Sequence, residues 1–156
     1  MKLYIKQQVF TWGDKFEVKD SEGNARYFVE GEVFSWGKKL HIYDTNGVEV
    51  IYIAQELMTF LPRYQIFVNN ILSAEIVKEF SFFLPRYRID KLGWKIEGHF
   101  GAHDYTITQN NSQIVSISKN WFTWGDSYVL DINDPQNELV ALAVVITIDC
   151  VIAQSS

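Results

Sequence analysis

The sequence lacks several features that would indicate a function directly. It has one cysteine, Cys150, so an internal disulfide is excluded, and we expect a buried, inert thiol. Its 14 lysine and arginine residues are outnumbered by 19 acidic residues, which gives a net charge of −5. A general nucleic-acid binder needs a basic surface, so we expect no nucleic-acid partner, and attraction to an anionic membrane is weakened. No G-x-S-x-G motif and no phosphate-binding glycine loop is present.

Membrane-directed segments are also scarce. Met1–Gln8 contains no continuous apolar region, so it is not a signal peptide, and we expect a cytoplasmic protein. The one long apolar run is Leu139–Ala153, in which Asp149 is the only charge. As a helix it would be roughly 22 Å long, shorter than the bilayer core of about 30 Å, and Asp149 would cost about 3 kcal/mol in lipid. We interpret the run as a buried helix that does not span a membrane. A membrane tail anchor and a strand through Val144–Ile148 are the alternatives.

The start of this helix is well marked. Asn133 and Asp134 are suitable N-cap residues, Pro135 suits a first helical position, and Glu138 complements the positive end of the helix dipole. The run that follows is apolar on every side, which is typical of a helix at the centre of a protein core.

The chain is rich in aromatic residues and in short segments of alternating polarity. Five tryptophans, eight tyrosines and eleven phenylalanines favour β-structure. Turn residues such as Asn46-Gly47 separate the alternating segments, which predicts about twelve strands. The expected strands are 2–6, 15–19, 26–33, 40–43, 49–55, 64–68, 71–79, 87–90, 94–98, 105–109, 114–120 and 127–132. No linker interrupts them, so we expect a single domain over residues 1–156.

The number of strands and the apolar helix together predict a fold. An eight-stranded barrel is filled by its own side chains, whereas about twelve strands enclose more space. A helix about 10 Å across would fill that space, and closing the sheet would remove its exposed edges. The expected fold is therefore mainly β, a closed antiparallel barrel of about twelve strands around one central hydrophobic C-terminal α-helix.

Two internal repeats occur in the chain. Phe10–Asp14 recurs as Phe34–Lys38 and Phe122–Asp126, and Phe60–Tyr64 recurs without change as Phe83–Tyr87. We interpret the first repeat as a bend at which glycine permits the turn and the two aromatic residues cover one rim of the core. In the second repeat, proline interrupts the backbone hydrogen bonds between strands before a new strand begins. The alternative is a ligand-binding rim of aromatic and arginine side chains.

Four stretches of the chain resemble a known family. They are Met1–Asp20, Trp94–Ile107, Ile114–Ile132 and Ala141–Ile152. Their order and spacing are similar to those of the LURP-one-related family, which includes YxjI-like bacterial members and belongs to the tubby C-terminal-like superfamily. The resemblance implies a twelve-stranded barrel around a central hydrophobic helix.

The resemblance implies little about biochemistry. Most members of the family have no assigned activity, and plant relatives are linked to pathogen defence. Tubby proteins bind phosphoinositides and act in signalling or transcription, and phospholipid scramblases are more distant relatives. No basic motif of this chain matches a lipid site position by position, so the resemblance assigns no site residue.

Few side chains are candidates for catalysis or metal binding. His99 and His103 are clustered with Asp104, but a zinc site needs three or four ligands and Cys150 belongs to another element. We therefore expect no metal, no cofactor and no catalytic residue. Asp149 must be paired, hydrogen-bonded or protonated in its apolar helix. We expect a structural contact with an arginine or a backbone amide, and a position at the barrel mouth is the alternative.

Three arginines are the candidate ligand-binding residues. Arg63 and Arg86, with Arg88 nearby, would lie on one rim if the two repeated Phe-Leu-Pro-Arg-Tyr segments were side by side. Such a group could bind a phosphate or carboxylate bidentately. The simpler interpretation is that each arginine pairs with a surface acid or stacks on a tyrosine.

These observations leave three hypotheses about function. The first is a non-enzymatic cytosolic binding or signalling-adaptor domain that contacts phospholipid headgroups or a protein partner. The second is a small-molecule enzyme with a site at the barrel mouth. The third is a structural or oligomer-forming stress-response protein.

Overall fold

The structure, a computed structural model, describes residues 1–6, 15–32, 36–82, 86–120 and 127–155. Each of the twelve expected strands is present, with ends that differ from the expected ones by two residues at most. The strands are β1 (Lys2–Lys6), β2 (Lys15–Lys19), β3 (Ala25–Gly31), β4 (Lys39–Asp44), β5 (Glu49–Gln55), β6 (Arg63–Val68), β7 (Ile71–Glu79), β8 (Arg86–Asp90), β9 (Trp94–His99), β10 (Asp104–Gln109), β11 (Ser112–Asn120) and β12 (Ser127–Ile132). Two 3₁₀ turns, η1 (Phe100–Ala102) and η2 (Pro135–Asn137), precede β10 and the helix α1 (Glu138–Ser155).

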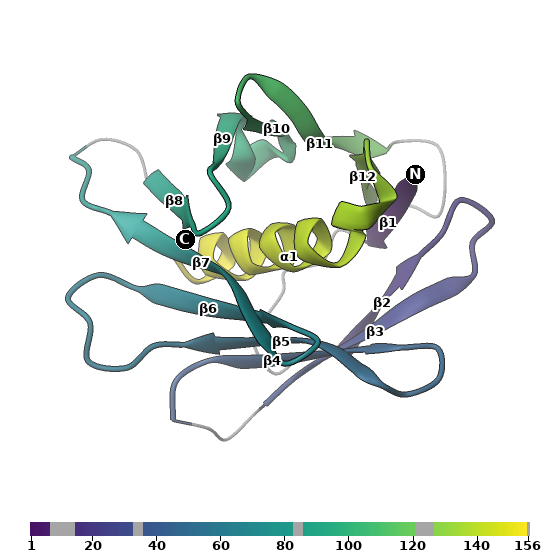
Figure 1. The fold of residues 1–156 in the computed structure, drawn as a ribbon, viewed down its shortest axis with the longest axis horizontal. Coiled ribbons are helices and arrows are strands. Elements are labelled where there is room, and N and C mark those ends of the chain that lie inside the picture. The colour runs from purple at the N-terminus through teal and green to yellow at the C-terminus, as the bar shows by residue number, and fades with distance from the viewer. Residues whose placement is uncertain (7–14, 33–35, 83–85, 121–126, 156) are drawn as a thin grey trace.

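The strands form one antiparallel sheet that curls around α1 (Figure 1). Their order is β8-β7-β6-β5-β4-β3-β2-β1-β12-β11-β10-β9, so the first strand, β1, pairs with the last strand, β12. The expected barrel around a C-terminal helix is confirmed. It is nearly closed rather than fully closed, because β8 and β9 are the two edges of the sheet within the described residues.

The helix α1 forms the core of the barrel. Asp134 caps the preceding turn η2 by accepting a hydrogen bond from the Gln136 backbone amide at 3.0 Å. Every residue from Ala141 to Val151 is buried. The segment Pro135–Ile152 is long and apolar enough to cross a membrane, with a mean hydropathy of 1.5, but 61% of it is buried inside the barrel. Its apolar surface is thus covered by the strands, each large side chain contributing about 2 kcal/mol on burial.

Side chains alternate between the two faces of each strand, and those on the inner face pack around α1 to complete the core. In β5, Ile51 and Ile53 are buried against the helix side, and Tyr52 between them lies on the outer face. In β4, Leu40 and Ile42 are buried, and His41 lies outside. Because strand side chains alternate between faces, a shift of one residue would reverse every one of these positions.

Tight turns join many of the strands. Asn69 and Asn70 connect β6 to β7 with φ values of 49° and 66°. Asparagine tolerates this left-handed conformation, which matches the twist of a two-residue hairpin. Asp44 stabilises the β4–β5 turn by accepting hydrogen bonds from the backbone amides of Asn46 and Val48 at 2.9 and 3.0 Å.

The two sequence repeats lie partly outside the described residues. Phe10–Asp14 and Phe122–Asp126 fall there, as do the first residues of the repeats at Phe34–Lys38 and Phe83–Tyr87. In the described part, Gly37 has a φ of 78°, which confirms the expected bend. The expectation that the aromatic residue covers the core is wrong at Trp36, whose side chain is 88% exposed.

Candidate functional site

Six large apolar side chains are exposed at one end of the barrel. They lie on the loop between β3 and β4, the loop between β5 and β6, and the loop between β7 and β8. We call them the apolar crown: Trp36, Leu57, Met58, Phe60, Phe80 and Phe82. Phe60 is 94% exposed and Phe82 is 85% exposed. Single exposed apolar residues are common, but a group of them marks an interaction site in a folded protein.

Backbone contacts hold the three loops next to one another. The Gln55 amide donates to the Lys38 carbonyl at 2.8 Å, which joins the first two loops. The Lys78 amide on β7 donates to the Pro62 carbonyl at 2.9 Å, which joins the second loop to the strand that leads into the third. In Figure 1 these loops lie together on the left, at the end of the barrel that holds the C-terminus of α1.

The backbone at Met58 is strained. Its φ is 62°, in the left-handed region, and its side chain is fully exposed. For a residue other than glycine, asparagine or aspartate this conformation costs roughly 1–2 kcal/mol. The exposed side chain makes no packing contribution to compensate, and such strain is found preferentially at functional sites.

A hollow of about 660 Å³ lies between the second and third loops. Phe60, Leu61 and Phe80 form its apolar wall. Val77 lies beneath it and is only 7% exposed, although its register with Arg63 and Arg88 places it on the outer face. The hollow therefore reaches from the crown loops to the outer surface of the sheet, where Val77 is covered.

Two of the three candidate arginines border this hollow. Arg63 on β6 and Arg88 on β8 both face Val77 on the strand between them, so they lie in one row across three strands. Arg86 is exposed at the start of β8, opposite Glu79. The structure thus places Arg63 and Arg88 in one row, whereas the repeated segments pointed to Arg63 and Arg86 as the pair.

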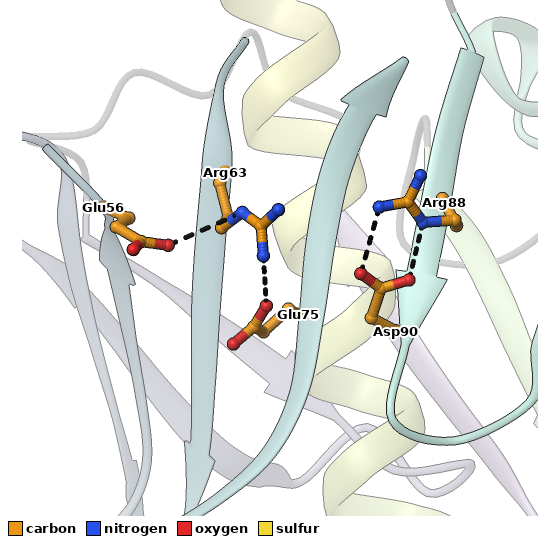
Figure 2. Close-up of polar contacts among 5 residues, drawn as sticks. All are labelled: Glu56, Arg63, Glu75, Arg88 and Asp90. Atoms are coloured by element: carbon orange, nitrogen blue, oxygen red, sulfur yellow. Dashed lines mark hydrogen bonds and ion pairs between the residues drawn. The ribbon is translucent and has the colours of Figure 1, made fainter. Parts of the chain in front are cut away.

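Both arginines in the row are already paired with carboxylates (Figure 2). Arg63 lies 2.8 Å from Glu75 and 3.6 Å from Glu56. Arg88 holds both oxygens of Asp90, with N–O distances of 2.6 and 3.2 Å. The hydrogen bond from Arg88 holds the pKa of Asp90 below its usual value. Glu79 also lies 3.6 Å from Arg88, so four carboxylates surround the two guanidinium groups and the rim is not a basic anion site.

The partners of Asp149 differ from those expected. Its two carboxylate oxygens accept hydrogen bonds from the Tyr128 hydroxyl and from His103, whose Nε2 lies at 3.1 Å. The expectation of an arginine or a backbone amide is wrong. His103 and Tyr128 are 46 and 21 residues away in the chain, and barrel closure brings them to the helix.

Two nearby polar atoms in the core lack a hydrogen-bond partner in the described part of the chain. They are His103 Nδ1 and the hydroxyl of Tyr105, a residue that is 3% exposed. Burial and then the charge of Asp149 raise the pKa values of Tyr105 and Tyr128 well above the usual range. Sequence reasoning missed both tyrosines because they look like ordinary inward-facing strand residues.

His41 forms a second cluster, on the outer face of the sheet. Its Nε2 lies 2.7 Å from Glu32, its Nδ1 bonds Glu49, and its ring stacks on Tyr52 at 5.0 Å. Burial alone lowers the pKa of His41, but the two carboxylates outweigh it and raise the pKa above its usual value. The carboxylates bond opposite ring nitrogens, so this trio cannot bind a common metal ion. Among the described residues, no group of three or more His, Cys, Asp and Glu side chains could hold a metal.

The opposite end of the barrel contains a hollow of about 860 Å³ near the start of α1. Glu138 lies in its wall, but its carboxylate is occupied by Arg26 at 2.5 Å and Tyr27 at 2.6 Å. Asp44, also in the wall, caps its own turn. Both carboxylates are therefore engaged in structural hydrogen bonds, and neither is positioned as a general acid or base.

A twelve-stranded antiparallel barrel around a buried C-terminal helix defines the class of this protein, the tubby C-terminal-like fold. A solved structure of a protein from Arabidopsis thaliana shares this fold with a TM-score of 0.62, covering 93% of this chain and 87% of that chain at 14% identity.

The sequence comparison specifies the family. The LURP-one-related family model matches residues 1–149, so the chain belongs to that family. The uncharacterized protein YxjI of Bacillus subtilis (strain 168) is 34% identical over 152 residues, which cover 97% of this chain and 94% of YxjI.

Proposed function

We propose that this chain is a non-enzymatic cytosolic binding domain that attaches to the surface of phospholipid membranes through the apolar crown. The observation that carries the proposal is the exposure of six large apolar side chains on three adjoining loops. Loop tips that protrude from a barrel end can enter a bilayer without unfolding the sheet behind them.

The residue types of the crown suit a membrane interface. Tryptophan and other aromatic side chains are favoured at the level of the lipid headgroups. Lys78, Arg63 and Arg88 lie directly behind the apolar tips, where their long side chains can reach the headgroups while their stems contact apolar groups. Burying a phenylalanine contributes about 1.5–3 kcal/mol, so a few inserted side chains are enough for reversible binding.

The charges favour insertion as the main source of affinity. The chain carries a net charge of −5, which opposes approach to an anionic surface. To bind a lipid phosphate, Arg63 and Arg88 would first have to release a carboxylate partner. Their net contribution to the free energy of membrane binding is therefore small. Arg63, Arg86 and Arg88 are therefore proposed as secondary headgroup contacts, and we expect binding to depend only weakly on salt.

Vesicle co-sedimentation tests this proposal. The purified protein is mixed with phosphatidylcholine vesicles, and with vesicles that also contain phosphatidylserine, at low and high salt. We expect binding to both, with little loss at high salt. Arg63→Gln/Arg88→Gln should reduce binding a few-fold, and Phe60→Ser/Phe82→Ser should nearly abolish it. Absence of binding to either vesicle would contradict a membrane role and leave a protein partner as the occupant of the crown.

A further inference from the structure

We propose that the apolar crown selects bilayers by the packing of their lipids, and that it prefers strongly curved, loosely packed surfaces to flat, tightly packed ones. This inference rests on the proposed attachment to membranes and specifies which membranes the chain binds. It follows from the charge, the bulk and the depth of the side chains that insert.

Charge gives the crown little help in binding a bilayer. In the described segments that carry the crown, residues 36–38, 56–62 and 80–82, the charged side chains are Lys38 and Glu56. Behind these segments, four carboxylates surround Arg63 and Arg88, and the whole chain has a net charge of −5. Affinity therefore comes from apolar insertion, which requires space between the lipid headgroups.

Two of the inserting side chains form one bulky unit. The rings of Phe80 and Phe82 pack edge to face, with centroids 4.9 Å apart and planes 83° apart. Both rings are exposed, Phe80 by 67%, so the pair projects from the protein surface. Because the rings already contact each other, they enter the lipids together. The pair therefore needs a wider gap between headgroups than a single side chain does.

Polar groups directly behind the tips limit the depth of insertion. The hollow between the second and third loops is lined by Thr59, Lys78, Glu79 and Arg88 in addition to its apolar wall. Charged groups are costly in hydrocarbon, so these side chains keep the crown at the boundary between headgroups and acyl chains.

Shallow insertion of a wide group makes binding depend on the curvature of the membrane. Such a group separates the lipids of one leaflet at the level of the headgroups. On a convex surface the outer headgroups are already spread apart, whereas on a flat surface the rings must separate them, which opposes binding. No electrostatic attraction compensates for this cost, so the affinity of the crown should follow lipid packing.

Phosphatidylcholine vesicles of two sizes test the inference. Binding of the purified protein to vesicles of about 30 nm and about 200 nm diameter is measured per accessible lipid, because the two surfaces differ in packing and not in charge. We expect about tenfold tighter binding to the small vesicles. Adding cholesterol to the large vesicles, which tightens lipid packing, should weaken binding further.

Two variants of the ring pair separate bulk from apolar character. Phe80→Leu/Phe82→Leu keeps apolar side chains of smaller width, so it should still bind both sizes, with a preference of about twofold. Phe80→Ser/Phe82→Ser should lose most of its binding to the small vesicles. Both rings are exposed in the folded protein, so neither variant should impair folding.

A matched control removes exposed apolar groups at the other end of the barrel. Val48→Ser/Ile71→Ser should keep the full preference for small vesicles. Equal binding of the wild-type protein to both sizes would overturn this inference and leave membrane attachment intact, whereas absence of binding to both would contradict the proposed function itself. An undiminished preference in the leucine variant would also overturn the inference, since the bulk of the ring pair would then not sense packing.

Discussion

The two ends of the barrel are built differently. At the end where α1 begins, strands are joined by short turns such as Asn69–Asn70, and aspartates such as Asp44 satisfy the turn amides. At the end where α1 finishes, loops such as residues 56–62 carry the exposed side chains of the crown. The turns lie toward the right and the crown loops toward the left of Figure 1.

The difference indicates that one end of the barrel contributes to stability and the other end to binding. At the turn end, polar groups bond one another and fix where α1 starts, as Glu138 does with Arg26 and Tyr27. At the crown end, apolar side chains are exposed at the loop tips, and Met58 has a strained backbone. Changes at the turn end should therefore alter stability, and changes at the crown should alter binding.

The largest expected effect is on vesicle affinity. Phe60→Ser/Phe82→Ser removes two inserted rings, and each lost ring costs at least about tenfold, so affinity for phosphatidylcholine vesicles should fall by about 100-fold or more. The free energy of unfolding should change by less than about 0.5 kcal/mol, because both side chains are exposed in the folded protein.

The control for this variant lies at the other end. Val48 and Ile71 are 56% and 68% exposed beside the tight turns, so Val48→Ser/Ile71→Ser removes comparable exposed apolar groups. Vesicle affinity should stay within twofold of wild type. Equal losses in the two double variants would show that binding is not confined to the crown.

Glu138→Ala should have the largest effect on stability. It removes a carboxylate that Arg26 and Tyr27 share, leaving the hydroxyl of the buried Tyr27 unpaired, and should lower the free energy of unfolding by about 2 kcal/mol. Urea unfolding measures this loss. The exposed turn residue Glu22 is the matched control, and Glu22→Ala should change stability by less than about 0.5 kcal/mol.

Protonation of the Glu138 carboxylate should lower the stability of the protein in acid. Burial raises the pKa of Glu138, but the hydrogen bonds from Arg26 and Tyr27 outweigh it and lower the pKa below its usual value. This contribution is present above the ordinary glutamate pKa and is lost as pH falls through the lowered one. Unfolding measured from neutral to acidic pH should show a smaller loss in Glu138→Gln; identical curves would contradict this role.

Met58→Gly should separate stability from binding. Glycine adopts the positive φ without strain, so the variant should be about 0.5–1 kcal/mol more stable after the cost of its greater freedom when unfolded. Vesicle affinity should fall several-fold because an apolar tip is lost. Leu57→Gly, at a neighbouring residue with negative φ, should gain no stability. A destabilised Met58→Gly protein would argue against strain at the crown.

The smallest effect is expected at His41, midway between the ends. The hydrogen bonds to Glu32 and Glu49 raise its pKa, so the stabilisation is complete below the ordinary histidine pKa of about 6.5 and is lost as pH rises through the raised value. The change should be less than about 1 kcal/mol, since surface ion pairs contribute little. His41→Gln should lack this pH dependence in chemical unfolding, whereas Tyr43→Phe should retain it.

Local patterns were enough to predict the barrel from the sequence. Alternation such as Ile51-Tyr52-Ile53 marks a strand with one buried face, and Asn69-Asn70 marks the turn that follows it. Leu139–Ala153 is apolar on all sides, so it had to be enclosed. Each of these signals acts within a few residues, which is why strand ends agree so closely with the structure.

The candidate site was less predictable because exposure is a property of the assembled fold. Phe60 and Ile66 are both apolar in the sequence, yet Phe60 is 94% exposed and Ile66 is fully buried. Asp149 was recognised as a carboxylate in need of partners, but His103 and Tyr128 reach it only after the barrel has formed. Contacts between distant strands depend on register, which no local pattern specifies.

The most direct test of the central claim is the orientation of the barrel on a bilayer. Spin labels are attached to Met58→Cys at the crown and, in a second protein, to Val48→Cys at the turn end. Cys150 is 1% exposed and does not compete for the label. With phosphatidylcholine vesicles, the Met58 label should become accessible to oxygen dissolved in the bilayer and shielded from a water-soluble nickel complex, and the Val48 label should remain in water. Two labels that stay equally accessible to nickel would contradict docking through the crown.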